Sequence, residues 1–455
     1  MTLLPLLVAT ELVENSSFLF AAGAVAQGLA GGPQAFALVL AAYAAGSMVM
    51  IGLQQWLSRH LGYRRYLLAS LGLFVLGALG SLLSHSLGGL LLARLVQGLG
   101  GGALFTSGRI LVVLLFSRDD RPRALRRFIA LLFGLGLLGP ALAAALLQGA
   151  GWQAVFAAPL PLALISLLGV WRLLPDGVGR SAEPVRWHAG PVLALVAAAA
   201  ALQLALSELR ALPQLRLAPW AGLALAGLLL LAALGWRQRH HAQPLLHWRG
   251  LHHPGYLSGL AMYALYDLIA SASGALLPVL AAQHLGLGMP TVGLLACLGA
   301  LASWLAALAY LRHGARASSK RRLMAGGAVA MALACGWLAA VPAGAAWWQL
   351  LPAVLVKGVF GALFVLPLAG LTFRDLDDQR FAPGYQAKNL VRHLALPLGA
   401  ALVAGGLVRL EPTSAVPSGP ASPARLMHAN LELFAALALA CLVLAAWTWL
   451  QRRWP

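Results

Sequence analysis

Long apolar runs alternate with short polar connections along nearly the whole chain. A helix that crosses a membrane needs about 20 consecutive, mainly apolar residues, and this length predicts fourteen such helices. Their approximate limits are 4–27, 34–57, 64–86, 88–116, 124–148, 152–174, 189–209, 218–236, 256–284, 290–311, 323–343, 347–372, 383–408 and 429–451. The pattern therefore predicts an all-α integral membrane protein with little of the chain outside the bilayer.

Composition supports this interpretation. The chain of 455 residues is 60% hydrophobic and only 10% charged, a balance that excludes an ordinary soluble domain. The net charge of +19 at pH 7 would suit nucleic-acid binding, but the basic residues fall between apolar runs and not on a solvated face. The first apolar run has two acids and no basic segment before it, so we expect a retained helix and not a cleaved signal peptide.

The lysines and arginines predict the orientation of the helices, because basic residues are retained on the cytoplasmic side of a membrane. Most of the 32 Lys and Arg residues lie in every second connection or in the C-terminal tail. The connections on the opposite side contain Arg210, Arg216, Arg409 and Arg425. We therefore expect a multi-pass protein of the cytoplasmic (inner) membrane with both termini in the cytoplasm.

Two predicted cytoplasmic connections resemble each other: LSRHLGYRR after the second span and LRHGARASSKRR after the tenth. An offset of eight spans predicts a repeated six-helix unit, and transporters built from repeats bind substrate near the midplane where the halves meet. The predicted units are residues 1–175 and 241–455, with an inserted helix pair and its linkers in residues 176–240. Short cytoplasmic loops tend to be basic, so a chance likeness stays open.

Several motifs, in order along the chain, carry a resemblance to a known family. GLQQWLSRHLGYRR, residues 52–65, resembles the signature between helices 2 and 3 of the major facilitator superfamily, and LLARLVQGLGGG, residues 91–102, resembles its fourth-helix signature. GLGLLGP, residues 134–140, and WQAVF, residues 152–156, are similar to its fifth-helix antiporter signature and the start of helix 6. With fourteen spans and QPLLHWRGL before the ninth, the chain resembles the EmrB/QacA-type drug:proton antiporters.

The resemblance implies a major-facilitator fold of two six-helix halves plus an inserted hairpin. It also implies a proton-driven exporter of amphipathic small molecules that works by alternating access. Glycine and proline inside the fifth span predict a kink or a close helix contact there. The residues expected to act in the conformational change are Gly62, Arg64, Arg65, Gly134, Gly136, Gly139 and Pro140.

Three positions depart from the family pattern. Ser58 stands where an aspartate is usual, which weakens any expectation of a cytoplasmic charge lock. Glu14 stands where the first helix often has aspartate, so the acid is kept. Ala143 and Ala144 stand where a glycine pair is common.

The first span contains two acids, Glu11 and Glu14, which share one helix face with Asn15 and Phe18. A charge near the bilayer centre costs roughly 2.5–3.5 kcal/mol on insertion scales, and such residues usually face a bundle interior or a watery cavity. Burial favours a protonated carboxyl group, whereas a nearby cation favours the ionised form. A carboxylate that alternates between these surroundings can carry a proton. The alternative is a helix-end carboxylate that reaches cytoplasmic water.

Basic residues in other spans provide partners for these acids. Arg94 shares a face of the fourth span with Gln97 and with glycines that let another helix approach, and we expect it to pair with Glu14. The repeat predicts a similar pair in the second half, between Asp267 in the ninth span and Lys357 in the twelfth. The residues assigned to proton coupling are Glu11, Glu14, Arg94 and Asp267. The alternative is that both pairs are static and only hold helices together.

The substrate is expected to be anionic or zwitterionic, such as a carboxylate-bearing metabolite, chelator or drug. Bases outnumber acids within the spans, and unpaired positive charge in a low-dielectric cavity is costly unless a ligand compensates it. Lys357 and Arg392 lie near mid-span in the second half and are the expected anion contacts. The other candidate substrate-binding residues are Asn15, Phe18, Gln97, Arg109 and Asn389. The excess disappears if Lys388 and Arg109 reach cytoplasmic water, which stays open.

Other kinds of chemistry find little support in the sequence. The chain has no Gly-Lys-Ser/Thr phosphate loop for ATP, and its three cysteines lack metal-ligand spacing. The irregularly spaced histidines within residues 240–253 indicate a solvated loop and not a metal site. No cofactor, metal or nucleic acid is expected, and the expected partners are a small-molecule substrate, protons and the lipid bilayer. A proton-coupled importer, a membrane receptor and a lipid-modifying enzyme stay as alternatives, and attachment of a periplasmic adaptor and an outer-membrane channel stays open.

Overall fold

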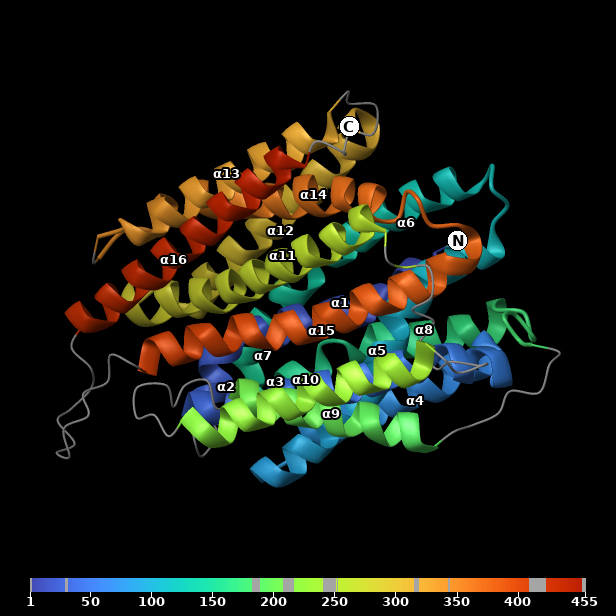
Figure 1. The fold of residues 1–455 in the computed structure, drawn as a ribbon. Coiled ribbons are helices and arrows are strands. Elements are labelled where there is room, and N and C mark those ends of the chain that lie inside the picture. Colours follow the sequence, from blue (N-terminus) through green and yellow to red (C-terminus); the bar gives the residue numbers. More distant parts are fainter. Residues whose placement is uncertain are drawn as a thin grey trace.

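The computed structural model describes residues 2–28, 32–181, 189–207, 217–239, 251, 253–314, 319–342, 344–408 and 423–451. Within these residues every regular element is a helix (Figure 1). The α-helices are α1 (Leu3–Phe20), α2 (Ala22–Gly28), α3 (Gly32–Leu61), α4 (Tyr63–Leu82), α5 (Leu87–Leu115), α6 (Arg121–Leu135), α7 (Leu138–Ala150), α8 (Leu160–Leu173), α9 (Ala189–Ser207), α10 (Leu217–Arg239), α11 (Pro254–Val279), α12 (Met289–Arg312), α13 (Lys320–Ala339), α14 (Leu351–Thr372), α15 (Asp378–Val408) and α16 (Pro423–Leu450). Short 3-10 helices lie at Trp152–Ala157 and Trp347–Gln349, and a π-helical turn at Leu280–His284 follows α11.

The helices lie where the apolar runs predicted them. In the part of the chain that the structure describes, twelve helical stretches are long and apolar enough to cross a membrane. α9 and α15 match the seventh and thirteenth predicted spans but are not among these twelve, so the count of fourteen crossings stays a prediction. The first predicted span is divided into α1 and α2 by a turn at Ala21, and the fifth into α6 and α7.

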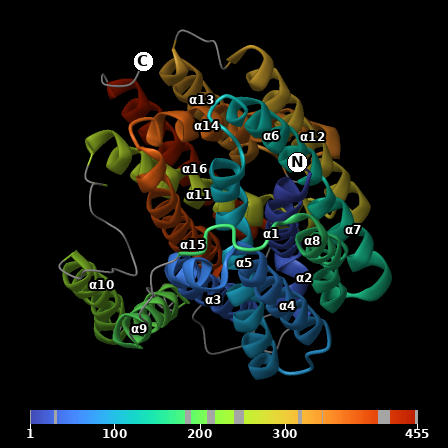
Figure 2. The same ribbon diagram turned by 90° about the vertical axis from the view of Figure 1, so that its right-hand side faces the viewer.

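The helices form two groups, one containing α1 to α8 and the other α11 to α16 (Figures 1 and 2). The groups meet where α1 packs on α11, where α3 and α5 pack on α15, and where α6 and α7 pack on α12. Substrate sites of transporters built from repeats lie at such a junction. The unit boundaries at residues 1–175, 176–240 and 241–455 stay a prediction.

The pair α9 and α10 lies outside the two groups, beside α3 (Figure 2). Leu195 of α9 fills the space next to Gly52, where a Cβ would lie 1.9 Å from the Leu195 Cδ2 atom. Met48, Ile51 and Leu390 belong to the same apolar cluster, so α9 packs against residues from both groups.

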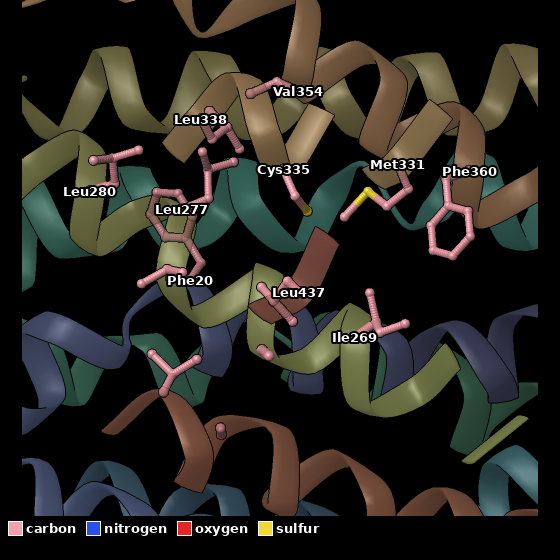
Figure 3. Close-up of a cluster of buried hydrophobic side chains, with 14 of the residues drawn as sticks. Phe20, Ile269, Leu277, Leu280, Met331, Cys335, Leu338, Val354, Phe360 and Leu437 are labelled. Atoms are coloured by element: carbon pink, nitrogen blue, oxygen red, sulfur yellow. The ribbon is translucent and has the colours of Figure 1, made fainter. Parts of the chain in front are cut away.

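One apolar core fills the second group of helices (Figure 3). Leu277 of α11, Met331 of α13, Val354 of α14 and Leu437 of α16 all belong to it. Phe20 at the end of α1 joins the same core, so apolar packing also crosses between the groups.

Glycines bring helices into backbone contact at corresponding places in the two groups. A Cβ on Gly98 of α5 would lie 2.1 Å from the carbonyl oxygen of Tyr43 in α3. A Cβ on Gly358 of α14 would lie 2.1 Å from the carbonyl oxygen of Gly299 in α12. Each contact joins the fourth helix of a predicted repeat to its second, as expected if the same backbone packing occurs twice.

The basic connections predicted to be cytoplasmic lie at one end of the bundle. Arg64 donates a hydrogen bond of 2.6 Å to Asp176, which joins the first turn of α4 to the segment after α8. Arg121 donates one of 2.9 Å to Asp378, which joins the two groups of helices. This hydrogen bond holds the pKa of the exposed Asp378 carboxyl below its usual range. In Figure 1, α1 begins and α16 ends at this same end; its location in the cytoplasm stays a prediction.

Gly98→Ala should lower the thermal unfolding midpoint of the purified protein in detergent, because the new methyl group meets the Tyr43 carbonyl oxygen. Overpacking of this kind costs about 1–3 kcal/mol. Gly72→Ala is the matched control, because nothing lies within 4 Å of a Cβ at Gly72. Equal midpoints for the two variants would contradict the tight α3–α5 contact.

Candidate functional site

Two adjoining cavities lie between the two groups of helices. The larger, of about 380 Å³, is bounded by α1, α5 and α6 on one side and by α11, α12, α14 and α15 on the other. The smaller, of about 310 Å³, extends towards Phe20, Leu277 and Pro278. Both are lined by Ser16, Leu19, Tyr266, Ala270, Ala300, Ser303 and Gly361. The volumes lie at the lower end of the roughly 300–1,000 Å³ typical of small-molecule sites.

Glu14 and Arg94 form the predicted ion pair, with 2.5 Å between Glu14 Oε1 and Arg94 Nη1. The Arg94 guanidinium is fully buried and lies 4.4 Å from the ring centre of Phe18 and 4.5 Å from that of Tyr43. Gln97 accepts a second hydrogen bond from Arg94, at 2.7 Å. Neither Phe18 nor Gln97 lines the two cavities. The pairing and the aromatic faces offset the cost of removing these ions from water.

Glu11 joins the two groups of helices. Its Oε1 atom accepts a hydrogen bond of 3.1 Å from Arg392 of α15 and lies 3.5 Å from the ring nitrogen of His393. Asn15, one turn further along α1, donates to the same oxygen at 3.3 Å. The Glu11 side chain is fully buried, so the alternative of a carboxylate in cytoplasmic water does not hold here.

The predicted pair between Asp267 and Lys357 is wrong. Lys357 Nζ instead donates to the backbone carbonyl of Ser273 at 3.0 Å. Asp267 lines the larger cavity and Lys357 the smaller one. Ser273 is six residues beyond Asp267 on α11, which corresponds to about 9 Å along the helix, so the two charged groups lie at different depths. The two groups of helices therefore share a close glycine contact but not the pairing of their charged side chains.

Asp267 keeps one oxygen unsatisfied. Its side chain is 6% exposed, and its Oδ2 atom has no hydrogen-bond partner. The cations that attract its charge are Lys388 and Arg392, with a contribution from His393. This Oδ2 oxygen is available to a proton or to a hydrogen-bond donor of a ligand.

Lys388 and Arg392 line the larger cavity from α15. Lys388 is buried, with its ammonium group 4.7 Å from the Tyr263 ring centre and 5.2 Å from that of Phe105, so it does not extend into cytoplasmic water. The Arg392 guanidinium also lies over the Phe105 ring, 4.0 Å from its centre. The site therefore combines cations with aromatic faces.

Two expected substrate contacts lie outside both cavities. Arg109 packs over the Phe381 ring, 5.5 Å from its centre, near the start of α15. Asn389 donates to the Thr106 hydroxyl at 3.0 Å, and this bond joins α15 to α5. Both residues thus contact the junction of the two groups, and their role in substrate binding stays a prediction.

The fifth span, where a kink or a close helix contact is expected, has both a break in its helix and a close contact with α1. α6 ends at Leu135 and α7 begins at Leu138. A Cβ on Gly139 would lie 1.9 Å from the Ser16 hydroxyl, and Ser17 donates to the Gly139 carbonyl at 2.9 Å. Gly136 and Pro140 each line one of the cavities, and Gly134 lies close to the Trp304 ring of α12. The role of these residues in exchange stays a prediction.

The connection after α3 is held by defined contacts. Gly62 has a φ of 79°, a backbone conformation that favours glycine. The backbone N–H of the next residue, Tyr63, donates a hydrogen bond to the Val178 carbonyl. Arg64 donates to Asp176 and to the carbonyl of Trp171. Arg65 is exposed.

The predicted histidine-rich loop lies mostly outside the described residues. His253, the described member, lies 3.7 Å from the Asp375 carboxylate. Among the described residues, no group of three or more His, Cys, Asp or Glu side chains could hold a metal ion.

Sequence reasoning missed two members of the site. His393 directly follows Arg392 and reaches the same Glu11 oxygen. Tyr43 covers one face of Arg94 from the second span. The polar run KNLVRH, within an otherwise apolar span, was the available signal for His393; an aromatic residue in a membrane helix gives no such signal.

A family model described as the Major Facilitator Superfamily matches residues 6–373. The chain is 28% identical over 412 residues to a putative multidrug resistance protein MdtD of Pectobacterium atrosepticum, with 89% of this chain and 86% of the relative covered. It is 27% identical over 382 residues to a protein of the same name from Salmonella typhi, with 82% and 79% covered.

Solved structures share the fold. The human organic anion transporter MFSD10 (TETRAN) has a TM-score of 0.66 at 15% identity, with 98% of this chain and 99% of that chain covered. An auto-inhibited peptide transporter of the POT family has a TM-score of 0.62 at 18% identity, with 99% and 97% covered. At these identities the likeness extends to the arrangement of the helices alone.

Loss of one partner of the buried Glu14–Arg94 pair should destabilise the protein by about 3–5 kcal/mol, because the other charge is left uncompensated. The double variant Glu14→Gln/Arg94→Gln should lose less than the sum of the two single variants in a double-mutant cycle of chemical unfolding. Asp176→Asn, which breaks an exposed pair with Arg64, should cost about 1 kcal/mol or less. Additive losses at Glu14 and Arg94 would show that the two side chains are not coupled.

Proposed function

The chain belongs to the Major Facilitator Superfamily and is a multi-pass membrane transporter; on this premise we propose that it exports amphipathic small molecules in exchange for protons. Alternating access requires the two groups of helices to separate at one end and close at the other. The proposal places the chain in the inner membrane with both termini in the cytoplasm.

The observation that carries the proposal is the junction made by Glu11. An ionised Glu11 attracts Arg392 across the boundary between the groups of helices. A proton on Glu11 removes the negative charge and weakens this attraction, which favours separation of the groups. The proton therefore acts where the conformational change has to occur.

Two further acids extend the proposed proton-coupling group. Glu14 lies one turn from Glu11 and is balanced by Arg94, and Asp267 faces the larger cavity. The Oε2 atoms of Glu11 and Glu14 and the Oδ2 atom of Asp267 lack hydrogen-bond partners, so each acid has an oxygen able to accept a proton. A proton that moves down the membrane potential supplies about 2.3 kcal/mol per 100 mV.

The direction and the kind of substrate are supported by three features. The fifth helix is interrupted at its glycines and contacts both α1 and α12. The cavities are mainly apolar with a few charged groups, which suits amphipathic molecules. Similar proteins bear the name multidrug resistance protein.

Glu11→Gln should reduce transport driven by a pH gradient by about tenfold or more, the effect of losing about 1.4 kcal/mol of coupling. Downhill exchange should remain, because glutamine keeps the size of the side chain but cannot carry a proton. The measurement is uptake of a panel of fluorescent amphipathic drugs into inside-out vesicles, with and without an acidic interior.

Glu432→Gln is the matched control, because Glu432 is exposed and its carboxylate lies 3.3 Å from His428 of the same helix. Unchanged uphill transport in Glu11→Gln vesicles would remove Glu11 from the coupling role. Movement of drug and proton in the same direction would indicate an importer. If no drug moves either with or without the pH gradient, the protein does not transport these drugs by proton coupling.

A further inference from the structure

The structure assigns the two adjoining cavities to one zwitterionic amphiphile, whose cationic group binds Asp267 and whose anionic group binds Lys357. The inference rests on the proposed export function and names the substrate class of the same site. Some of the buried charges in the site already have a partner in the protein, and Asp267 and Lys357 have no ion-pair partner among the described residues.

Most of the buried positive charge already has a protein partner. Arg94 is paired with Glu14, and Arg392 is paired with Glu11. Of the remaining three bases, Arg109 lies outside both cavities, Lys388 lines the larger cavity together with Asp267, and Lys357 lines the smaller one.

Lys357 forms the anionic subsite. It is the charged residue among those that line the smaller cavity, and no acid lines that cavity in the described part of the chain. The Ser273 carbonyl takes one of its three N–H donors, which leaves two for a ligand. The hydroxyl groups of Ser16 and Ser303 line the same cavity and are further donors to an anion.

Asp267 forms the cationic subsite. Its unpartnered Oδ2 atom is buried at the larger cavity, which Tyr263 and Tyr266 also line. Lys388 attracts Asp267, but in the described structure the two side chains form no ion pair. The Lys388 ammonium instead packs against the Tyr263 ring and donates a hydrogen bond to Asn389. A carboxylate in a cavity that aromatic residues also line is suited to an ammonium group.

The helix geometry sets the length of the ligand. The Lys357 ammonium contacts Ser273, six residues along α11 from Asp267, so the two subsites are separated by about 9 Å along this helix. Leu19, Tyr266 and Ala270 line both cavities and provide an apolar wall between the subsites. A ligand with a short apolar body and opposite charges at its two ends fits this arrangement.

A zwitterion also fits exchange for protons. An ammonium group and a proton cannot both neutralise Asp267, so a bound substrate excludes the proton at this acid. The other charged groups that act on Asp267 are Lys388, Arg392 and His393. A purely anionic substrate would lack this competition, because a proton on a nearby acid strengthens anion binding.

The test is calorimetric binding to the purified protein at one pH and without a gradient. The three probes have the same chain length: ω-aminooctanoate is the zwitterion, octanoate the anion and octylammonium the cation. ω-Aminooctanoate should bind about tenfold or more tightly than either of the others, because it alone reaches both subsites. γ-Aminobutyrate, which is too short, should bind more weakly than ω-aminooctanoate.

Two variants assign the ends of the ligand. The Lys357→Met variant should bind ω-aminooctanoate only as tightly as it binds octylammonium. Its affinity for octylammonium should equal that of the wild-type protein. Asp267→Asn should bind the zwitterion and octanoate equally. The retained ligand in each case shows that the variant is folded. Lys320→Met, which changes a lysine outside both cavities, should keep the wild-type preference.

A wild-type protein that does not prefer the zwitterion would overturn the assignment, and so would an unchanged preference in Lys357→Met. Because binding is measured without a gradient, this result is independent of proton coupling. Loss of the zwitterion preference with intact coupling at Glu11 would reject the substrate class alone, whereas uphill transport unaffected by Glu11→Gln would reject the coupling alone.

Discussion

The contact of Glu11 with Arg392 and His393 connects the two groups of helices through buried side chains. In a membrane interior an ionised group needs a partner, and the partner of Glu11 comes from the opposite group. Any movement that separates the groups at this depth has to neutralise Glu11 or supply new partners. The arrangement therefore makes the protonation of one carboxyl group and the relative position of the two groups depend on each other.

The two groups share backbone packing but use their charges differently. Gly98 and Gly358 allow the same kind of close helix contact in each. In the first group, however, Glu14 and Arg94 form a closed pair beneath aromatic rings. In the second, Asp267 and Lys357 face different cavities. Under the proposed function the paired Glu11 and Glu14 serve coupling, Asp267 serves both a proton and the ligand, and Lys357 serves the ligand.

The cavities, the interrupted fifth helix and the cross-group contacts all lie at the junction of the two groups. α6 and α7 are separated beside the cavities, where Gly136 and Pro140 form part of the wall. At the end of the bundle near the basic connections, Arg121 and Asp378 hold the groups together. The exposed contact at that end is screened by water, so it is easier to break than the buried one at Glu11.

Hydrophobicity along the sequence was sufficient to locate the helices, because crossing a bilayer demands about 20 apolar residues and this requirement is local. The motifs were sufficient to identify the family, and the position of Arg94 beside glycines predicted its contact with Glu14. Only the tertiary structure decided that Glu11 pairs with Arg392, which is 381 residues away. It also decided that Lys357 donates a hydrogen bond to the Ser273 carbonyl and does not pair with Asp267. Such pairings depend on the rotation and depth of helices from distant parts of the chain, which hydrophobicity does not specify, since a shift of a few residues along a helix moves a charge by several ångströms.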